Sequence, residues 1–283
     1  MTYHAKGTGH GAAPDSGNVR GTPCGRREFL ATSALGLGAL MSACRSGTAP
    51  LIAPHATLRS RPRMPTGTIA LGYTSLGIGN PLIGRDAVLH VPANYDPATP
   101  APLLVMLHGT AGGGDDWSSE EFRAIVDPLG IIVLAPDSRS YGSWDLLEDG
   151  DYARDVEFID DALAWTFARC RVDPSRITIG GFSDGASESL GLGVVNGDLF
   201  SAILGFSPGA LHAPHQRGAP RAFLSHGTAD AVLPFAYTRD EIVPAMRDAG
   251  LAVEFVAFDG NHELPLEVAS QAFAWLAAEP LTA

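Results

Sequence analysis

The pentapeptide Gly181-Phe182-Ser183-Asp184-Gly185 constrains the fold of this chain more than any other segment. It follows the β-branched run Ile177-Thr178-Ile179, which favours a strand, and it precedes residues that favour a helix. At such a junction the G-x-S-x-G spacing predicts a nucleophile elbow, a sharp turn that exposes the serine hydroxyl and has no room for larger flanking side chains. Because the chain has 33 glycines, the spacing alone could arise by chance, and the prediction for Ser183 needs support from other segments.

The composition supports one large domain and excludes several functions. With 283 residues and 45% hydrophobic content, the chain can bury a sizeable core. Its formal net charge is -12 and its cations form no cluster, which argues against a nucleic-acid partner. Cys24, Cys44 and Cys170 have neither a disulfide pattern nor metal-site spacing, so zinc is not indicated. Cys170 ends an apolar stripe of helical spacing, which predicts a buried structural thiol.

The first residues resemble an export signal rather than part of a fold. Arg26-Arg27 precede an apolar run from Phe29 to Ala43, a pattern similar to a twin-arginine signal. The run is shorter than the ~20 residues that a spanning helix needs, so we expect no transmembrane anchor. The twin-arginine export machinery is therefore an expected partner.

The apolar run ends in Leu40-Met41-Ser42-Ala43-Cys44, which resembles a bacterial lipoprotein cleavage box with Cys44 as the lipidated residue. Met41 stands where leucine is more usual, and ordinary cleavage downstream, after Ala49, is the alternative. Both readings predict an exported protein in the periplasm or at the cell surface, touching the membrane only through its N-terminus. We expect a signal in residues 1–43, a flexible tether in 44–65 and a catalytic domain in 66–283.

From residue 66 onward, apolar segments alternate with helix-like segments. This alternation predicts an α/β fold, with a mostly parallel central sheet of about eight strands and helices on both faces. Strands are expected at 68–76, 87–91, 103–107, 131–135, 177–182, 202–206, 222–225 and 253–258, the first two as antiparallel edge strands. Helices are expected at 117–126, 155–169, 183–195, 236–249 and 265–276.

Two residues downstream complete a candidate catalytic triad. For a serine on such an elbow, the acid and then the histidine follow in the chain. His262 is the only histidine after residue 226, and it lies in a loop after the last expected strand. Asp230 lies just beyond an earlier strand, whereas Asp259 is too close in sequence to His262 to reach its far ring nitrogen. Asp230 is therefore the expected acid, His262 the base and Ser183 the nucleophile.

The glycine-rich segment His108 to Gly114 follows a predicted buried strand. Small residues let backbone N–H groups face a substrate, and we assign the oxyanion donors to the N–H groups of Thr110 and Asp184. A phosphate-binding loop would need the Lys-Ser/Thr ending or the G-x-G-x-x-G spacing, and both are missing here. The scheme requires no cofactor and no metal.

Together, His108-Gly109, the elbow, His226-Gly227-x-x-Asp230-x-x-x-Pro234 and His262 resemble the phospholipase/carboxylesterase and acyl-protein thioesterase group of α/β-hydrolases. The resemblance covers residues 86–276 and extends to polyhydroxybutyrate-depolymerase-like and feruloyl esterases. It implies an α/β-hydrolase fold and a serine esterase. Thioesterases of this group usually carry Gln after the serine, and Asp184 at this position would disfavour anionic acyl groups.

The segment from Ser207 to Pro220 is too short for a lipase lid, so we expect a minimal lid and an open site that suits short to medium acyl chains. Trp117, Trp144 and Leu233 are candidate substrate-binding residues, with rim packing as the alternative. The pair His212 and His215 could bind a metal, but exposed loop residues are the favoured interpretation.

The sequence thus predicts a serine carboxylesterase that acts on small-molecule or polymer esters through an acyl-enzyme. A feruloyl or polyester-type esterase and a phospholipase or thioesterase are the nearest alternatives. A serine peptidase of the prolyl-oligopeptidase type would usually bring a propeller domain, for which the chain has no room. A non-catalytic binding protein of this fold would typically lack one member of the triad.

Overall fold

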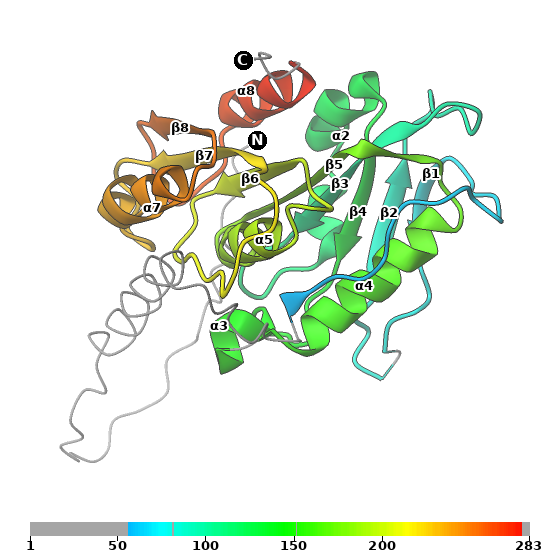
Figure 1. The fold of residues 1–283 in the computed structure, drawn as a ribbon, viewed down its shortest axis with the longest axis horizontal. Coiled ribbons are helices and arrows are strands. Elements are labelled where there is room, and N and C mark those ends of the chain that lie inside the picture. Colours follow the sequence, from blue (N-terminus) through cyan, green and yellow to red (C-terminus); the bar gives the residue numbers. More distant parts are fainter. Residues whose placement is uncertain (1–55, 81, 151, 279–283) are drawn as a thin grey trace, which may run out of the picture.

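The computed structural model describes residues 56–80, 82–150 and 152–278. In this part of the chain, eight strands form one sheet in the order β1-β2-β4-β3-β5-β6-β7-β8 (Figure 1). Strand β2 is antiparallel to both β1 and β4, and the strands from β4 to β8 are parallel. The predicted fold class, including antiparallel strands at one edge, is confirmed.

Most strands match their expected ranges because each is a continuous apolar run between turn residues. Strands β2, β6 and β8 have the predicted bounds, and β5 extends furthest beyond its prediction, starting at Val172. The strands are β1 Gly72–Ser75, β2 Ala87–Val91, β3 Ala101–Leu107, β4 Ile132–Pro136, β5 Val172–Phe182, β6 Ala202–Phe206, β7 Arg221–Gly227 and β8 Val253–Phe258.

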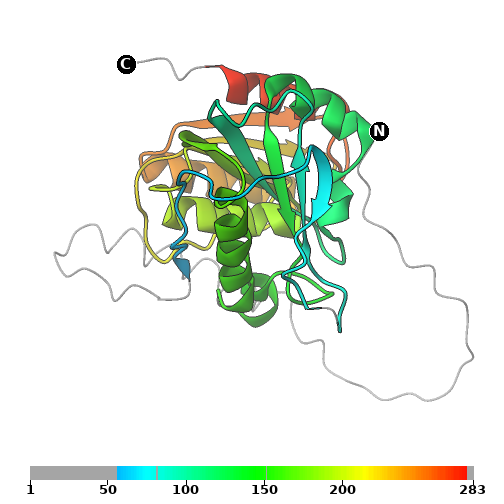
Figure 2. The same cartoon turned by 90° about the vertical axis from the view of Figure 1, so that its right-hand side faces the viewer.

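Helices cover both faces of the sheet, and each face has its own apolar core. Helices α4, α5 and α7 contribute to one core, and α2 and α8 to the other. Figure 2 shows the two layers on opposite sides of the sheet. The α-helices are α2 Glu120–Val126, α3 Asp145–Asp149, α4 Arg154–Phe167, α5 Asp184–Val195, α6 Phe235–Tyr237, α7 Val243–Asp248 and α8 Leu266–Ala277, with short helices η2 Gly114–Trp117, η3 Asp127–Leu129 and η4 Thr238–Ile242.

The helix expected at 236–249 is divided into α6, the π-helical η4 and α7. Pro244 lies in the first turn of α7, where it has no N–H to donate and its ring crowds the preceding turn. A local π-helical widening relieves this conflict. The short helix α3 was not predicted from the sequence.

The segment Ala56 to Arg61 corrects part of the predicted tether. Ala56 and Leu58 are fully buried, and the Leu58 N–H donates to Asn196 Oδ1 at 2.9 Å. The N–H groups of Arg59 and Ser60 donate to Asp160 Oδ1 at 2.8 and 2.7 Å. These contacts attach the segment to α4 and to the end of α5. Residues 44–55, and with them Cys44, lie outside the described residues.

The apolar stripe predicted to end at Cys170 lies in the core. Val156, Ile159, Leu163, Phe167 and Cys170 are at most 3% exposed, and burial raises the pKa of the Cys170 thiol to about 12. The thiol is therefore a packed, unreactive group, as predicted.

Because the strands from β4 to β8 are parallel, their carboxyl ends lie along one edge of the sheet. The segments that follow β3, β4, β5, β7 and β8 contain the candidate site residues of this domain. Residues 207–220 after β6 contain neither helix nor strand, in agreement with the minimal lid. No helix within the described ranges is long and apolar enough to cross a membrane.

Candidate active site

Ser183 lies on a strained turn between β5 and α5. Its backbone has φ 58° and ψ -119°, in the left-handed half of conformational space that a side chain with a Cβ rarely adopts. A Cβ at Gly181 would overlap the backbone of Gly185, and one at Gly185 would overlap the carbonyl of Leu107. The two flanking glycines are therefore required by close backbone approach, as the elbow interpretation predicts.

Ser183, His262 and Asp230 form a continuous chain of hydrogen bonds. Ser183 Oγ lies 2.8 Å from His262 Nε2, and His262 Nδ1 lies 2.7 Å from Asp230 Oδ2. Ser183 and His262 are each 7% exposed, and the Asp230 side chain is fully buried. Phe182 packs 4.9 Å from the His262 ring, centroid to centroid. With its Nδ1–H donated to the carboxylate, His262 presents an unprotonated Nε2 to the serine hydroxyl.

The Asp230 carboxylate accepts hydrogen bonds at both oxygens. Oδ1 accepts from the backbone N–H groups of Val232 and Leu233, each at 2.8 Å. Oδ2 also lies 3.1 Å from Nε2 of a second histidine, His226, at the end of β7. His226 belongs to a motif quoted above, but the sequence assigned it no role. Burial lowers the pKa of His226.

The two residues expected to form the oxyanion hole lie side by side. Thr110 Oγ1 donates to Asp184 Oδ2, which also accepts from Ser143 Oγ at 2.6 Å. Asp184 is the first residue of α5, where a backbone N–H has no acceptor within the helix. The loop after Thr110 is held by the Ala111 N–H, which donates to Gly142 O at 2.7 Å. Asp184 thus links the oxyanion loop to the loop after β4.

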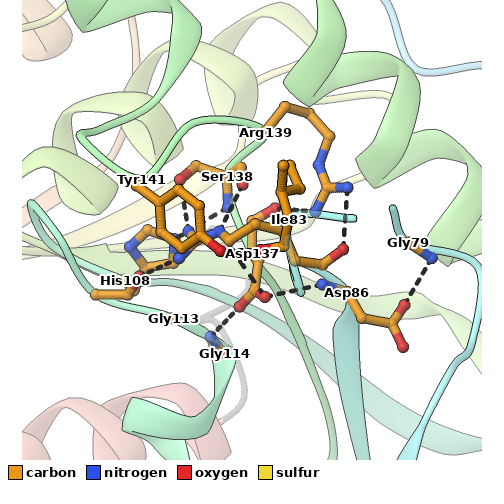
Figure 3. A network of polar contacts seen from close by, with 12 residues as sticks. Gly79, Ile83, Asp86, His108, Gly113, Gly114, Asp137, Ser138, Arg139 and Tyr141 are labelled. Carbon is orange, nitrogen blue, oxygen red and sulfur yellow. Dashed lines mark hydrogen bonds and ion pairs between the residues drawn. The ribbon is translucent and has the colours of Figure 1, made fainter. Parts of the chain in front are cut away.

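Arg85 and His108 form hydrogen bonds that hold this loop, and Figure 3 shows His108 beside Ser138. Arg85 is 6% exposed, and it donates to Gly112 O at 2.8 Å and to Ser138 O at 3.0 Å. Arg85 Nη2 and the Ser138 N–H both point to His108 Nε2, at 2.9 and 3.0 Å. Because both partners are donors, Nε2 is unprotonated and Nδ1–H donates to Gly109 O at 2.7 Å. Burial lowers the pKa of His108, in agreement with a neutral ring.

Two aspartates extend this support to the loop between β1 and β2. Asp137 accepts from the Gly114 N–H at 2.6 Å and from the Asp86 N–H at 2.8 Å. Asp86 in turn accepts from the Gly79 N–H at 2.9 Å, as Figure 3 shows. These contacts connect the glycine-rich segment to the antiparallel edge of the sheet. No sequence motif indicated this network, because its members are far apart in the chain.

The structure corrects the expectation for the two tryptophans. Trp144 is fully buried, and its indole N–H donates to His108 O at 2.9 Å. Trp117 is 3% exposed and packs against Phe122 with ring centroids 5.3 Å apart. Trp144 thus holds the His108 carbonyl from inside the core, and neither ring has a surface for a bound ester. Leu233 is half-buried beside Asp230 and Gly209, and its substrate-binding role stays a prediction.

A second group of buried acids lies between α3, α4 and α5. Asp145 and Asp155 are at most 1% exposed, and Asp155 accepts from the backbone N–H groups of Arg139 and Asp145. Burial raises the pKa of Asp155 to about 6. Glu188 on α5 is fully buried, and no described residue hydrogen-bonds to either of its carboxyl oxygens. Burial, with Asp155 and Asp145 nearby, raises its pKa well above the usual range.

The described residues contain no cluster of three or more His, Cys, Asp or Glu side chains that could hold a metal ion. His212 is exposed, and burial lowers the pKa of the half-buried His215. The pair therefore gains no third ligand from the described part of the chain.

A family model described as phospholipase/carboxylesterase matches residues 153–276, a range that includes Ser183, Asp230 and His262. Feruloyl esterase C of Emericella nidulans is 29% identical over 227 residues, which cover 68% of this chain and 81% of that protein.

Solved esterases share the fold at low sequence identity. A ferulic acid esterase of Anaeromyces mucronatus, in complex with ferulic acid, has a TM-score of 0.54 at 16% identity, over 82% of this chain and 96% of that one. Acetyl xylan esterase of Aspergillus awamori has a TM-score of 0.57 at 15% identity, over 72% of this chain and 98% of that one. The chain therefore has the α/β-hydrolase fold, and the relatives and structural neighbours that it resembles are esterases, feruloyl esterases among them.

Proposed function

We propose that this protein is a serine carboxylesterase that uses Ser183, His262 and Asp230 as its catalytic triad. The observation that carries the proposal is the chain of hydrogen bonds from Ser183 Oγ through the His262 ring to Asp230 Oδ2, with distances of 2.8 and 2.7 Å. Its atoms are in the order that nucleophilic acyl transfer requires. The metal-free scheme uses only groups of this chain.

In the first half-reaction, Ser183 Oγ attacks the ester carbonyl carbon while His262 Nε2 takes the hydroxyl proton. Asp230 holds the ring and stabilises the imidazolium that forms. The carbonyl oxygen becomes an oxyanion, which the N–H groups of Thr110 and Asp184 stabilise. When the C–O bond to the alcohol breaks, His262 returns the proton to the leaving oxygen. Water then repeats the sequence on the acyl-enzyme and releases the acid.

The acyl preference follows from the openness of the site. Residues 207–220 form no helix that could cover the catalytic edge, and Leu233 is the remaining candidate wall. Each methylene that is removed from water contributes about 0.8 kcal/mol, so a shallow site should stop gaining affinity at short or medium chains. A feruloyl ester is the second candidate substrate, because the similarity to feruloyl esterase C covers 68% of this chain.

The function is tested with p-nitrophenyl acetate, butyrate and octanoate and with methyl ferulate. We expect the parent to hydrolyse the shorter esters fastest and Ser183→Ala to lose about 10⁴-fold or more in kcat. Ser201→Ala, at an exposed position outside the site, is the matched control. Comparable turnover by Ser183→Ala would refute the mechanism, whereas methyl ferulate as the best ester would replace the short-acyl assignment by the feruloyl one.

We also propose that residues 1–43 direct twin-arginine export and that Cys44 carries a lipid anchor. Support comes from the order of Arg26-Arg27, the apolar run and the cleavage-box-like sequence. Fractionation of cells that express the parent and Cys44→Ala tests this assignment. Esterase should move from the membrane to the soluble extracytoplasmic fraction in the variant, and unchanged membrane association would refute the anchor.

A further inference from the structure

We propose that His226 is a positioning residue for the triad: its Nε2–H donates to Asp230 Oδ2 and fixes the carboxylate that orients His262. The inference rests on the proposed function, since it assigns a second histidine to the same acid. It concerns a side chain that has no contact with the reacting serine.

The proton on His226 Nε2 follows from its surroundings. Nε2 lies 3.1 Å from Asp230 Oδ2 and 3.1 Å from the carbonyl oxygen of Leu233. A carboxylate oxygen and a backbone carbonyl can only accept, so Nε2 must be the donor. The ring is fully buried, which prevents water from replacing it as the donor.

The other ring nitrogen, Nδ1, lies beside the hydroxyl of Thr238. Thr238 Oγ1 lies 2.9 Å from His226 Nδ1 and 3.0 Å from Pro208 O. The Thr238 hydroxyl donates its one proton to Pro208 O, so the contact at Nδ1 does not by itself assign the tautomer. Burial lowers the pKa of His226 and thus favours the neutral form. In the neutral ring the one proton therefore lies on Nε2, which faces two acceptors.

His226 would affect catalysis through Asp230 Oδ2, the oxygen that lies near both histidines. Asp230 Oδ2 accepts from two histidines, and its negative charge is divided between them. Without His226, this charge would act on His262 alone, and the carboxylate would be free to tilt. Asp230 and His262 are the titratable groups acting on His226, while Leu233, Phe235, Thr238 and Pro208 contribute neutral groups.

Two substitutions separate the hydrogen bond from the packing of the ring. In His226→Gln the side-chain amide nitrogen can reach the place of Nε2 and donate, whereas His226→Leu fills space without a donor. We expect His226→Leu to lower kcat by about ten- to a hundredfold, the range for a lost hydrogen bond to a charged group, with KM changed by less than about twofold. The acidic limb of kcat/KM should move to higher pH by about half a unit or more. His226→Gln should recover most of kcat and the original pH profile.

Equal impairment of both variants, or a pH profile of His226→Leu that matches the parent, would overturn the proposal. Nitrogen NMR of the parent protein measures the tautomer of His226 directly. This test does not depend on whether His226→Leu folds. We expect His226 to be the neutral Nε2–H tautomer at pH 7, and an Nδ1–H tautomer would refute the inference. Because Ser183→Ala tests the triad alone, failure of that experiment is distinguishable from failure of this one.

Discussion

Asp230 and Glu188 are both fully buried carboxyl groups, but the protein treats them in opposite ways. Asp230 accepts hydrogen bonds from two backbone N–H groups and from His262, and its Oδ2 lies 3.1 Å from His226 Nε2. Glu188 has no hydrogen-bond partner among the described residues, and burial raises its pKa well above the usual range. One acid is compensated as an anion and the other is kept neutral. Both acids are buried, so burial itself does not explain the difference. Hydrogen-bond donors around a buried carboxyl group determine whether it can carry the negative charge that an active site uses.

The largest expected effect comes from removing the charge of the compensated acid. Asp230→Asn should lower kcat by about 10⁴-fold, because no orientation of the amide suits its four donors. If the amide oxygen faces the histidines, its NH₂ group opposes the N–H groups of Val232 and Leu233. If it faces the backbone, the NH₂ group opposes His262 and His226, and His262 loses its tautomer.

Steady-state kinetics with p-nitrophenyl butyrate measure this loss, and the circular dichroism melting curve shows whether the variant folds. Asp240→Asn is the control, since Asp240 is an exposed carboxylate paired with Arg239 outside the site. If a folded Asp230→Asn kept a tenth of the activity, the acid would lie elsewhere and the comparison with Glu188 would lose its catalytic meaning.

The second prediction concerns the acid that is kept neutral. An unfolded glutamate ionises near pH ~4.3, whereas folded Glu188 holds its proton to a higher pH. Between these two pKa values the folded protein binds one more proton than the unfolded protein. The contribution of Glu188 to the free energy of unfolding therefore falls as pH rises. Glu188→Gln cannot ionise in either state. Relative to the parent, the variant should therefore gain up to about 1.4 kcal/mol of stability per pH unit in this window.

Urea unfolding between pH 7 and 8.5 measures this difference, in a range where Asp155, with a pKa of about 6, is largely ionised. Glu267→Gln, on the exposed surface of α8, controls for the loss of one negative charge. Parallel stability curves for the parent and Glu188→Gln would show that Glu188 has a partner that compensates its charge.

The smallest expected effect belongs to Asp184, a half-exposed carboxylate between these extremes. Its Oδ2 accepts from the Thr110 and Ser143 hydroxyls, and an asparagine oxygen can accept the same two bonds. Asp184→Asn should therefore keep the loop in place and remove only the charge beside the oxyanion. We expect hydrolysis of an anionic ester, relative to a neutral one, to improve about three- to tenfold.

The measurement is the ratio of kcat/KM for an anionic ester to kcat/KM for a neutral one. A suitable pair is the p-nitrophenyl half-ester of adipic acid, which is anionic, and p-nitrophenyl hexanoate, which is neutral. High salt should reduce the improvement, because a half-exposed charge is screened. A ratio that stays constant in the variant would mean that the Asp184 charge is too far from the acyl group to select substrates.

Local sequence patterns predicted most of the fold. Buried parallel strands are apolar on both faces, so runs such as Ala202–Phe206 and Val253–Phe258 have clear ends. The elbow, Asp230 and His262 could be proposed as a triad because chain order and strand ends restrict where a triad can lie. The short helix α3 and the division at Pro244 were missed, although the missing N–H of a proline within a helical pattern is a local signal for such a division.

The supports of the site could not be predicted in the same way. Arg85 reaches His108 and Ser138 across 23 and 53 residues, and no local pattern predicts contacts at such separations. Glu188 occupies a position on α5 where a sequence would suggest an ordinary polar residue, and only its full burial distinguishes it. Trp144 was expected beside the substrate because its loop lies at the catalytic edge, but a position in sequence does not determine which way a ring points.

The left-handed backbone of Ser183 gives this residue opposing effects on the proposed activity and on the stability of the fold. Glycine adopts this conformation without strain, so Ser183→Gly removes the nucleophile and relieves the turn together. A laboratory selection for heat resistance alone would therefore be drawn toward inactive proteins at this position. Any effort to stabilise the enzyme must retain this local weakness and seek its improvements elsewhere.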